Sequence, residues 1–385
     1  MRIFLNKSRR YEGLPIVSFS RQCLLLLGLV MLCGAQSHAG ELPAPTAQPA
    51  STKPDIADPQ AAGPDAAKSK GVSPENLAVV INELDAKSVE VGNYYLAARR
   101  IPPANLVKVS VTPGTRSLKP EYFSSLRQQV ISQLAPNIQA VLFVWTTPYA
   151  VGCNSITSAF TLGYDARQCE KTCAPGKPSA YFNAKSRSPL EDHGIRISML
   201  LPVESVEQAK ALIDRGVLST FRLNEASGYF LITSDKNRST RSQFFPKSGS
   251  IPVKRLEIKT LSANVIEDKH DVMFYFTGLT HVPGLATLDF MPGAIADHLT
   301  STGGDLLGKS QMSSLRWLEA GATASYGTVS EPCNYWQKFP NPIVVLKHYV
   351  AGETAIEAYW KSVAWPAQGL FIGEPLASPY CQDCN

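Results

Sequence analysis

Three short apolar runs, separated by amphipathic stretches, limit this chain to a small set of folds. The runs at Leu77–Asn82, Leu106–Val111 and Ile138–Trp145 are rich in branched residues, as buried parallel strands are. The i, i+3, i+4 spacing of apolar residues predicts a helix after each of the first two runs. Strand, helix, strand, helix, strand requires right-handed crossovers in a parallel sheet. We therefore expect an α/β fold: a mostly parallel, Rossmann-like layered sheet with helices on both faces.

The alternation resumes beyond residues 152–190, which hold three cysteines and several prolines and are expected to form an inserted loop. Residues 234–254, rich in Ser, Lys and Arg, are expected to be a variable connection. The further strands expected are Ile195–Leu201, Gly228–Thr233, Asp271–Phe276, Ala322–Val329 and Gly369–Ile372. The expected helices begin at about Ser88 and at Pro120 and then cover Ser205–Arg215, Pro292–Thr302, Ser313–Ala320, Pro342–Val350 and Thr354–Ser362.

The N-terminal residues have the pattern of a cleaved export signal. A basic lead precedes the apolar core Cys23–Cys33, and Ser37–Ala39 supplies small residues for cleavage before Gly40. The apolar core is shorter than the roughly 20 residues that span a bilayer, so no stable membrane span should remain after cleavage. The expected organisation is an export signal at 1–39, a disordered Pro/Ala-rich tether at 40–75 and a single large α/β domain at 76–385, which can divide into subdomains at 76–235 and 255–385.

The charge of the chain gives no reason to expect a nucleic-acid partner. The formal charge is +5, but the first 39 residues hold five basic side chains and one acidic one, so the remainder is close to neutral. The sequence has neither a glycine-rich phosphate loop nor a dense Asp-x-Asp cation loop, and we expect no cofactor and no metal ion. Export predicts a periplasmic or secreted bacterial protein whose partner is an extracytoplasmic protein or peptide.

Removal of the signal leaves six cysteines: Cys153, Cys169, Cys173, Cys333, Cys381 and Cys384. In an oxidising compartment their expected fate is disulfide bonding, and six cysteines allow 15 complete pairings. The spacings Cys169-x-x-x-Cys173 and Cys381-x-x-Cys384 leave a four-thiolate zinc site open as an alternative. Cys333 can be a disulfide member, an inert thiol, a nucleophile or a metal ligand.

Three short segments resemble parts of gingipain-type cysteine peptidases, which belong to the caspase and clostripain fold group. Val79–Pro102 resembles their first strand and helix, and Phe274–Gly278 resembles the strand before their catalytic histidine. Phe371–Leu376 is similar to a Gly-Asp-Pro turn near the end of such domains. Residues 76–380 as a whole, including the Glu331–Pro332 turn, resemble more closely a family of conserved exported bacterial proteins whose function is uncharacterised.

The peptidase resemblance implies a caspase-like fold with a histidine after one strand and a cysteine after the next. His281 follows the strand that ends at Phe276, and Cys333 lies 52 residues further on, close to the roughly 50-residue spacing known in caspases. The imidazole would take the thiol proton and leave a thiolate nucleophile, and Glu331 would orient the imidazole. His298, 35 residues before Cys333, is a second candidate base.

The sequence favours a degenerate, non-catalytic binding module and leaves a cysteine-type hydrolase as the alternative. Two residues separate His281 from the Thr-Gly pair that directly precedes the histidine in the peptidases. Pro332 and Asn334 flank the cysteine where small residues usually stand. A binding module would use the Glu331–Asn334 turn and the cysteine-rich loop to hold a protein or glycan. A third interpretation is a structural envelope protein on the tether.

Overall fold

The computed structural model describes residues 71–219 and 224–382, and the structural statements below concern these residues. The predicted export signal and residues 40–70 of the predicted tether lie outside them. Val72 is already buried, and the 3-10 turn η1 (Pro74–Asn76) leads directly into the first strand. In the described part of the chain, every helix is too short or too polar to cross a membrane.

Eleven of the described strands form one sheet, in the order β2-β1-β4-β7-β14-β13-β12-β11-β8-β10-β9. Eight neighbouring pairs are parallel, from β2 to β14 and from β13 to β10, and β13–β14 and β10–β9 are antiparallel. The expected α/β class with a mostly parallel sheet is therefore confirmed. The strands are β1 (Leu77–Asn82), β2 (Leu106–Val109), β4 (Ala140–Val144), β7 (Ile197–Leu201), β8 (Ala226–Ile232), β9 (Gly249–Ile251), β10 (Leu256–Ser262), β11 (Lys269–Thr277), β12 (Leu288–His298), β13 (Ala324–Thr328) and β14 (Gly369–Gly373).

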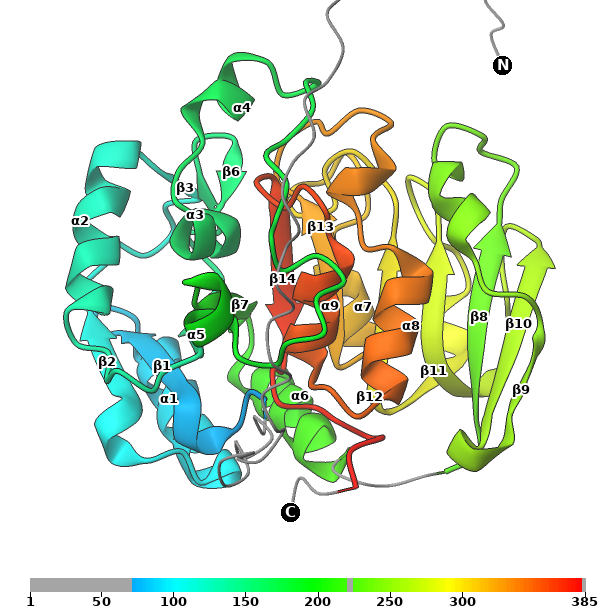
Figure 1. The fold of residues 1–385 in the computed structure, drawn as a ribbon, viewed down its shortest axis with the longest axis horizontal. Helices are drawn as coiled ribbons and strands as arrows, with labels where there is room; N and C mark the ends of the chain where they lie inside the picture. Colours follow the sequence, from blue (N-terminus) through cyan, green and yellow to red (C-terminus); the bar gives the residue numbers. More distant parts are fainter. Residues whose placement is uncertain (1–70, 220–223, 383–385) are drawn as a thin grey trace, which may run out of the picture. The chain divides into compact units, whose positions relative to one another are not determined.

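Helices cover both faces of this sheet. In Figure 1, α8 and α9 lie on the side that faces the viewer and α7 lies behind the sheet. Arg215 of α6 donates to the Leu318 carbonyl oxygen of α7 (2.9 Å), which places α6 beside α7. The helices are α1 (Ala86–Arg99), α2 (Pro120–Ile131), α3 (Ile156–Leu162), α4 (Ala166–Glu170), α5 (Pro189–His193), α6 (Val206–Leu218), α7 (Leu315–Ala320), α8 (Pro342–Val350) and α9 (Ala355–Ser362). Short strands β3 (Ser117–Leu118), β5 (Ala150–Val151) and β6 (Asn154–Ser155) form a second sheet.

The core follows from strands that are apolar on both faces. All six residues of β1 are buried, as are all five residues each of β4 and β7. Such strands pack between two helical layers, which is why their sequences show runs rather than alternation. At the opposite end of the sheet, β10 buries Leu256 and Ile258 but exposes Glu257, as expected of a strand near an edge.

One expectation for the second half of the chain was wrong. The helix predicted over 292–302 is strand β12, because its residues lie between β11 and β13 and are buried from Gly293 onward. A short apolar run buried on both faces carries no periodicity that distinguishes helix from strand. The segment 234–254, expected to be a variable connection, contains β9 and the 3-10 turn η3 (Thr240–Phe244).

The loop after β12 crosses directly over the end of β13. Gly304 N donates to Thr328 O (2.9 Å), and a Cβ on Gly304 would lie 2.5 Å from the carbonyl oxygen of Gly327. A Cβ on Gly327 would lie 2.3 Å from the backbone of Gly303, so both main chains require glycine here. The same loop reaches the segment after β4, where the Tyr149 hydroxyl donates to Asp305.

Candidate functional site

The turn after β13 is held by its own side chains and by Gln368. Gln368 Nε2 donates to Ser330 Oγ (2.8 Å) and to the Glu331 carbonyl oxygen (2.9 Å). The Glu331 carboxylate accepts a hydrogen bond from Cys333 N (2.8 Å). Cys333 has a φ of 56°, in the left-handed region that few non-glycine residues occupy. Glu331 thus fixes the backbone of Cys333, whereas we expected it to orient an imidazole.

The sulfur of Cys333 is bonded to that of Cys173, with the two Cα atoms 5.2 Å apart. Cys153 and Cys169 form a second disulfide, with a Cα separation of 5.3 Å, and Cys381 is also disulfide-bonded. All five cysteines of the described chain are therefore oxidised. The alternative of a zinc site is wrong, because Cys169 and Cys173 bond to separate partners. In the same residues, no group of three or more His, Cys, Asp or Glu side chains is arranged to hold a metal ion.

His281 lies in the exposed loop between β11 and β12. Thr280, its neighbour, accepts a hydrogen bond from Met312 N (2.8 Å), which places this loop above the end of β12. The His281 ring makes no hydrogen bond or ion pair with another described residue. No hydrogen bond between described residues joins it to Cys333, whose sulfur is bonded to Cys173.

His298 is the last residue of β12 and is 1% exposed. Trp317 Nε1 donates to His298 Nδ1 (2.9 Å), and Nε2 lies 3.1 Å from the Met312 carbonyl oxygen. Because a carbonyl oxygen only accepts and the indole only donates, the ring proton is on Nε2. Burial, with a smaller contribution from the Arg241 charge, lowers the pKa of His298 to about 3. The imidazole is neutral and both nitrogens are occupied, so the second candidate base has no free lone pair.

A buried ion pair beside His298 has no counterpart in the sequence prediction. Arg241 and Asp297 are each 1% exposed and form an ion pair, and Arg241 Nη2 also donates to the Thr277 carbonyl oxygen (2.9 Å). Arg241 comes from η3, inside the segment that we expected to be a variable connection. The sequence contains one indication of this ion pair: Asp297 is a carboxylate within an apolar run, and a buried charge is normally paired with an opposite one.

A concavity of about 200 Å³ opens beside Cys333, at the carboxyl ends of β12 and β13. Arg238 contributes its guanidinium, which donates to Asp235 (2.8 Å) and to Thr300 Oγ1 (3.3 Å). Neither candidate histidine lines this concavity. Its lining residues are Asn237, Arg238, Leu299, Thr300, Ser301, Glu331, Pro332, Cys333, Asn334 and Phe339.

The Cys173–Cys333 disulfide is one of several contacts that join the cysteine-rich segment (residues 152–190) to the chain after β13, and we call these contacts the seam. Lys338 is 1% exposed, and its Nζ donates to the Thr172 carbonyl oxygen (2.6 Å), next to Cys173. Burial lowers the pKa of Lys338 to about 8. Ser330 Oγ donates to the Cys153 carbonyl oxygen (2.7 Å) and extends the seam to the first disulfide.

A buried charged cluster fastens the same cysteine-rich segment to α8 and α9. His348 Nδ1 lies 2.7 Å from the Glu353 carboxylate, and its Nε2 lies 3.1 Å from Asn183 Oδ1. Lys347 also donates to Asn183 Oδ1 (2.9 Å), which fixes this atom as the acceptor. Both ring nitrogens of His348 therefore face acceptor oxygens. Lys361, fully buried, forms an ion pair with Glu353 (2.7 Å).

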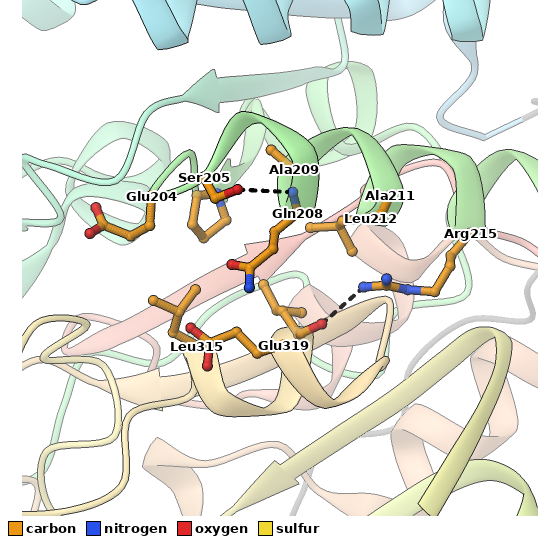
Figure 2. A pocket seen from close by; sticks show the side chains of 11 residues that line it. Glu204, Ser205, Gln208, Ala209, Ala211, Leu212, Arg215, Leu315 and Glu319 are labelled. Carbon is orange, nitrogen blue, oxygen red and sulfur yellow. Dashed lines mark hydrogen bonds between the residues drawn. The ribbon is translucent and has the colours of Figure 1, made fainter. Parts of the chain in front are cut away.

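A groove of about 230 Å³ lies between α6 and α7, and Figure 2 shows two hydrogen bonds among its residues, one at Ser205 and one at Arg215. Ser205 Oγ accepts from Gln208 N (3.3 Å) and so caps α6. Arg215 Nη2 donates to the carbonyl oxygens of Leu318 (2.9 Å) and Ala322 (3.2 Å). Burial raises the pKa of Glu319. Arg215 therefore holds α6 against α7 at one end of this groove.

No family model and no curated protein matches the chain. Two solved structures are similar in fold. One, titled "Structure of Protease", has 10% identity and a TM-score of 0.46 and covers 80% of this chain and 79% of its own. The other is the Arg-specific cysteine proteinase gingipain R, with 9% identity, a TM-score of 0.43 and coverage of 79% and 78%. Both titles name peptidases, the class that the sequence resembles distantly, and the likeness says nothing about catalysis in this chain.

Proposed function

We propose that this chain is an exported, non-catalytic binding module of caspase-like α/β fold, which holds an extracytoplasmic protein or peptide at the Glu331–Asn334 turn. The observation that supports the proposal is the bond between the sulfurs of Cys333 and Cys173. A cysteine nucleophile needs a free thiolate and a base in contact with it. The Cys333 sulfur is already bonded to that of Cys173, and neither candidate imidazole forms a hydrogen bond with it.

The turn is suited to binding because it is rigid and lies in a concave surface. Its backbone is fixed by Glu331 and Gln368, and the disulfide ties it to the cysteine-rich segment. The concavity beside it presents a guanidinium, a carboxylate, hydroxyls and an amide within about 200 Å³. Such mixed polar groups suit the alternating donors and acceptors of a peptide. The disulfides favour the periplasmic or secreted location, because they persist in oxidising compartments.

Peptide hydrolysis by matched cysteine variants tests the non-catalytic part. Cys173→Ala frees the Cys333 sulfur without a reductant, and Cys173→Ala/Cys333→Ala removes both sulfurs. We expect the wild-type protein and both variants to hydrolyse a mixed fluorogenic peptide library no faster than buffer. Hydrolysis by Cys173→Ala that is lost in the double variant would instead establish the cysteine-type hydrolase, with Cys333 as its nucleophile.

Selection of displayed peptides on the oxidised protein tests the binding part. Asn334→Ala and Ser301→Ala each remove a polar group from the concavity. Each should lower the affinity for the selected peptides by up to about tenfold, the cost of one hydrogen bond. Lys309→Ala, an exposed change outside the concavity, should leave binding unaltered. Peptides that bind all four proteins equally would show that this turn is not the binding site.

A further inference from the structure

A larger groove lies between α2 and the loop that follows β2. It encloses about 630 Å³, within the roughly 300–1,000 Å³ typical of small-molecule sites, and it shares no residue with the concavity beside Cys333. The residues that line it are Ser110, Val111, Thr112, Thr115, Ser117, Leu118, Lys119, Tyr122, Ser125, Leu126 and Gln129.

The loop that forms one wall of this groove is fixed through its backbone. The buried side chain of Asn82 accepts from Val111 N (2.9 Å) and donates to Val111 O (2.8 Å). Thr147 Oγ1 accepts from Gly114 N (3.1 Å), and the Arg116 carbonyl oxygen accepts from Tyr149 N (3.0 Å). A wall that is already ordered loses little entropy when a ligand binds.

The polar side chains that this wall presents to the groove, in contrast, have no hydrogen-bond partner among the described residues. Thr112, Thr115 and Ser117 make no side-chain hydrogen bond with another described residue, and the same holds for Lys119, which also has no ion pair there. The Tyr122 side chain is 70% exposed, so one face of its ring is available. Within residues 71–219 and 224–382, the hydroxyl of Ser110 and the side-chain amide of Gln129 also lack a hydrogen-bond partner. The groove thus offers free donors and acceptors beside an aromatic ring.

We propose that this groove binds a saccharide that carries a carboxylate or phosphate group. Hydroxyl and amide side chains both donate and accept, which matches the hydroxyls of a sugar. The Tyr122 ring and Leu118 offer an apolar surface for the C–H face of a pyranose. Lys119 is the one cation among the lining residues, and no carboxylate lines the groove, so an acidic group would form a charge-assisted hydrogen bond without repulsion. This proposal stands independently of the peptide site at Cys333.

Calorimetric titration of the oxidised protein with three defined sugars tests the proposal. Trigalacturonic acid carries carboxylates, glucose 6-phosphate carries a phosphate, and maltotriose is neutral. We expect one of the two acidic probes to bind and maltotriose to bind at least about tenfold more weakly. Tyr122→Ala and Lys119→Gln should each lower the affinity for the acidic probe by about tenfold. Thr115→Val, which removes only a hydroxyl, should lower it several-fold.

Lys309→Gln is the charge-matched control, since Lys309 is exposed and lies outside the groove. It should leave binding unchanged, and the melting temperatures of all variants should match that of the wild-type protein, because the altered side chains are solvent-exposed or free of partners. The proposal is overturned if neither acidic probe binds, or if binding survives both Tyr122→Ala and Lys119→Gln. Equal binding of maltotriose would overturn the assignment of an acidic ligand.

Discussion

The indole N–H of Trp317 determines the tautomer of His298, and burial determines the direction in which its pKa is shifted. With Nδ1 accepting from the indole and Nε2–H facing Met312, the folded state holds a neutral ring whose pKa is lowered by burial to about 3. An unfolded histidine titrates near 6.5. Between these two values the unfolded chain binds one proton more than the folded chain, so stability must rise with pH.

Lowering the pH from about 6.5 towards 3 should therefore remove stability by up to about 1.4 kcal/mol per pH unit from this residue alone. The free energy of unfolding in urea, measured at several pH values, gives the slope. His298→Gln cannot take up the proton, so its slope over this window should be shallower by that amount. His281→Gln, at an exposed site, should keep the wild-type slope; equal slopes in all three proteins would refute the assignment.

The buried pair of Arg241 and Asp297 makes a second prediction at the scale of single residues. Asp297→Asn leaves the Arg241 guanidinium buried without its counter-ion and should cost about 3–5 kcal/mol in the free energy of unfolding. Asp235→Asn breaks the partly exposed pair with Arg238 and should cost about 1 kcal/mol or less. Urea unfolding of both variants decides the matter, since similar losses would mean that burial of the pair is energetically irrelevant.

The charged cluster under the cysteine-rich segment acts at the scale of elements, because it joins α8 and α9 to residues near Asn183. Burial works to raise the pKa of Glu353, but the hydrogen bond from His348 and the charge of Lys361 prevail and lower it. Asn183 N also donates to the Lys361 carbonyl oxygen (2.8 Å), so one short stretch of loop is bonded to both helices.

Glu353→Gln should release this loop, because it leaves the buried ammonium group of Lys361 without its carboxylate partner. We expect a loss of about 3 kcal/mol in the free energy of unfolding, together with new proteolytic cleavage within residues 171–194. Adding Lys361→Met should restore part of the stability, because the unpaired buried charge of Lys361 is then removed as well. Glu90→Gln, which breaks an exposed pair with Lys210, is the control and should show neither effect.

The sequence predicts two kinds of element well. One is a helix with a regular spacing of apolar residues, and the other is a strand with a long run of branched apolar residues. The strands β1, β4 and β7 and the helices α6, α8 and α9 were expected within a few residues of their observed bounds. The strand β12 was missed because small residues and a terminal Asp-His resemble a helix with a polar end. The strand β10 was missed although Leu256 and Ile258 alternate with charged residues, since Pro252 and the basic residues around it indicated a loop.

The sequence predicted where the candidate site lies, but not which side chains are bonded to each other there. Strand order located the turn after β13, and cysteine content predicted oxidation. The partner of Cys333 could not be predicted, because six cysteines leave 15 pairings and only tertiary structure brings residues 173 and 333 together. The hydrogen bond from Trp317 to His298 Nδ1 likewise forms only in the tertiary structure.

At the scale of the whole molecule, the two internal disulfides should differ in their contribution to stability. The Cys173–Cys333 bond spans 160 residues and the Cys153–Cys169 bond spans 16. In the chain-entropy account, closing the longer loop stabilises the fold by about 5 kcal/mol and the shorter by about 3. Cys173→Ala/Cys333→Ala should therefore unfold at lower urea than Cys153→Ala/Cys169→Ala. The reverse order would show that folded-state packing outweighs loop closure.

The crossing of Gly303 and Gly304 over Gly327 leaves no clearance between two main chains. A methyl group added to Gly304 or Gly327 would push the loop after β12 outward and carry Asp305 away from the hydroxyl of Tyr149. Diversification of this surface is therefore confined to the loops on either side of the crossing, while Gly304 and Gly327 accept only hydrogen as a side chain.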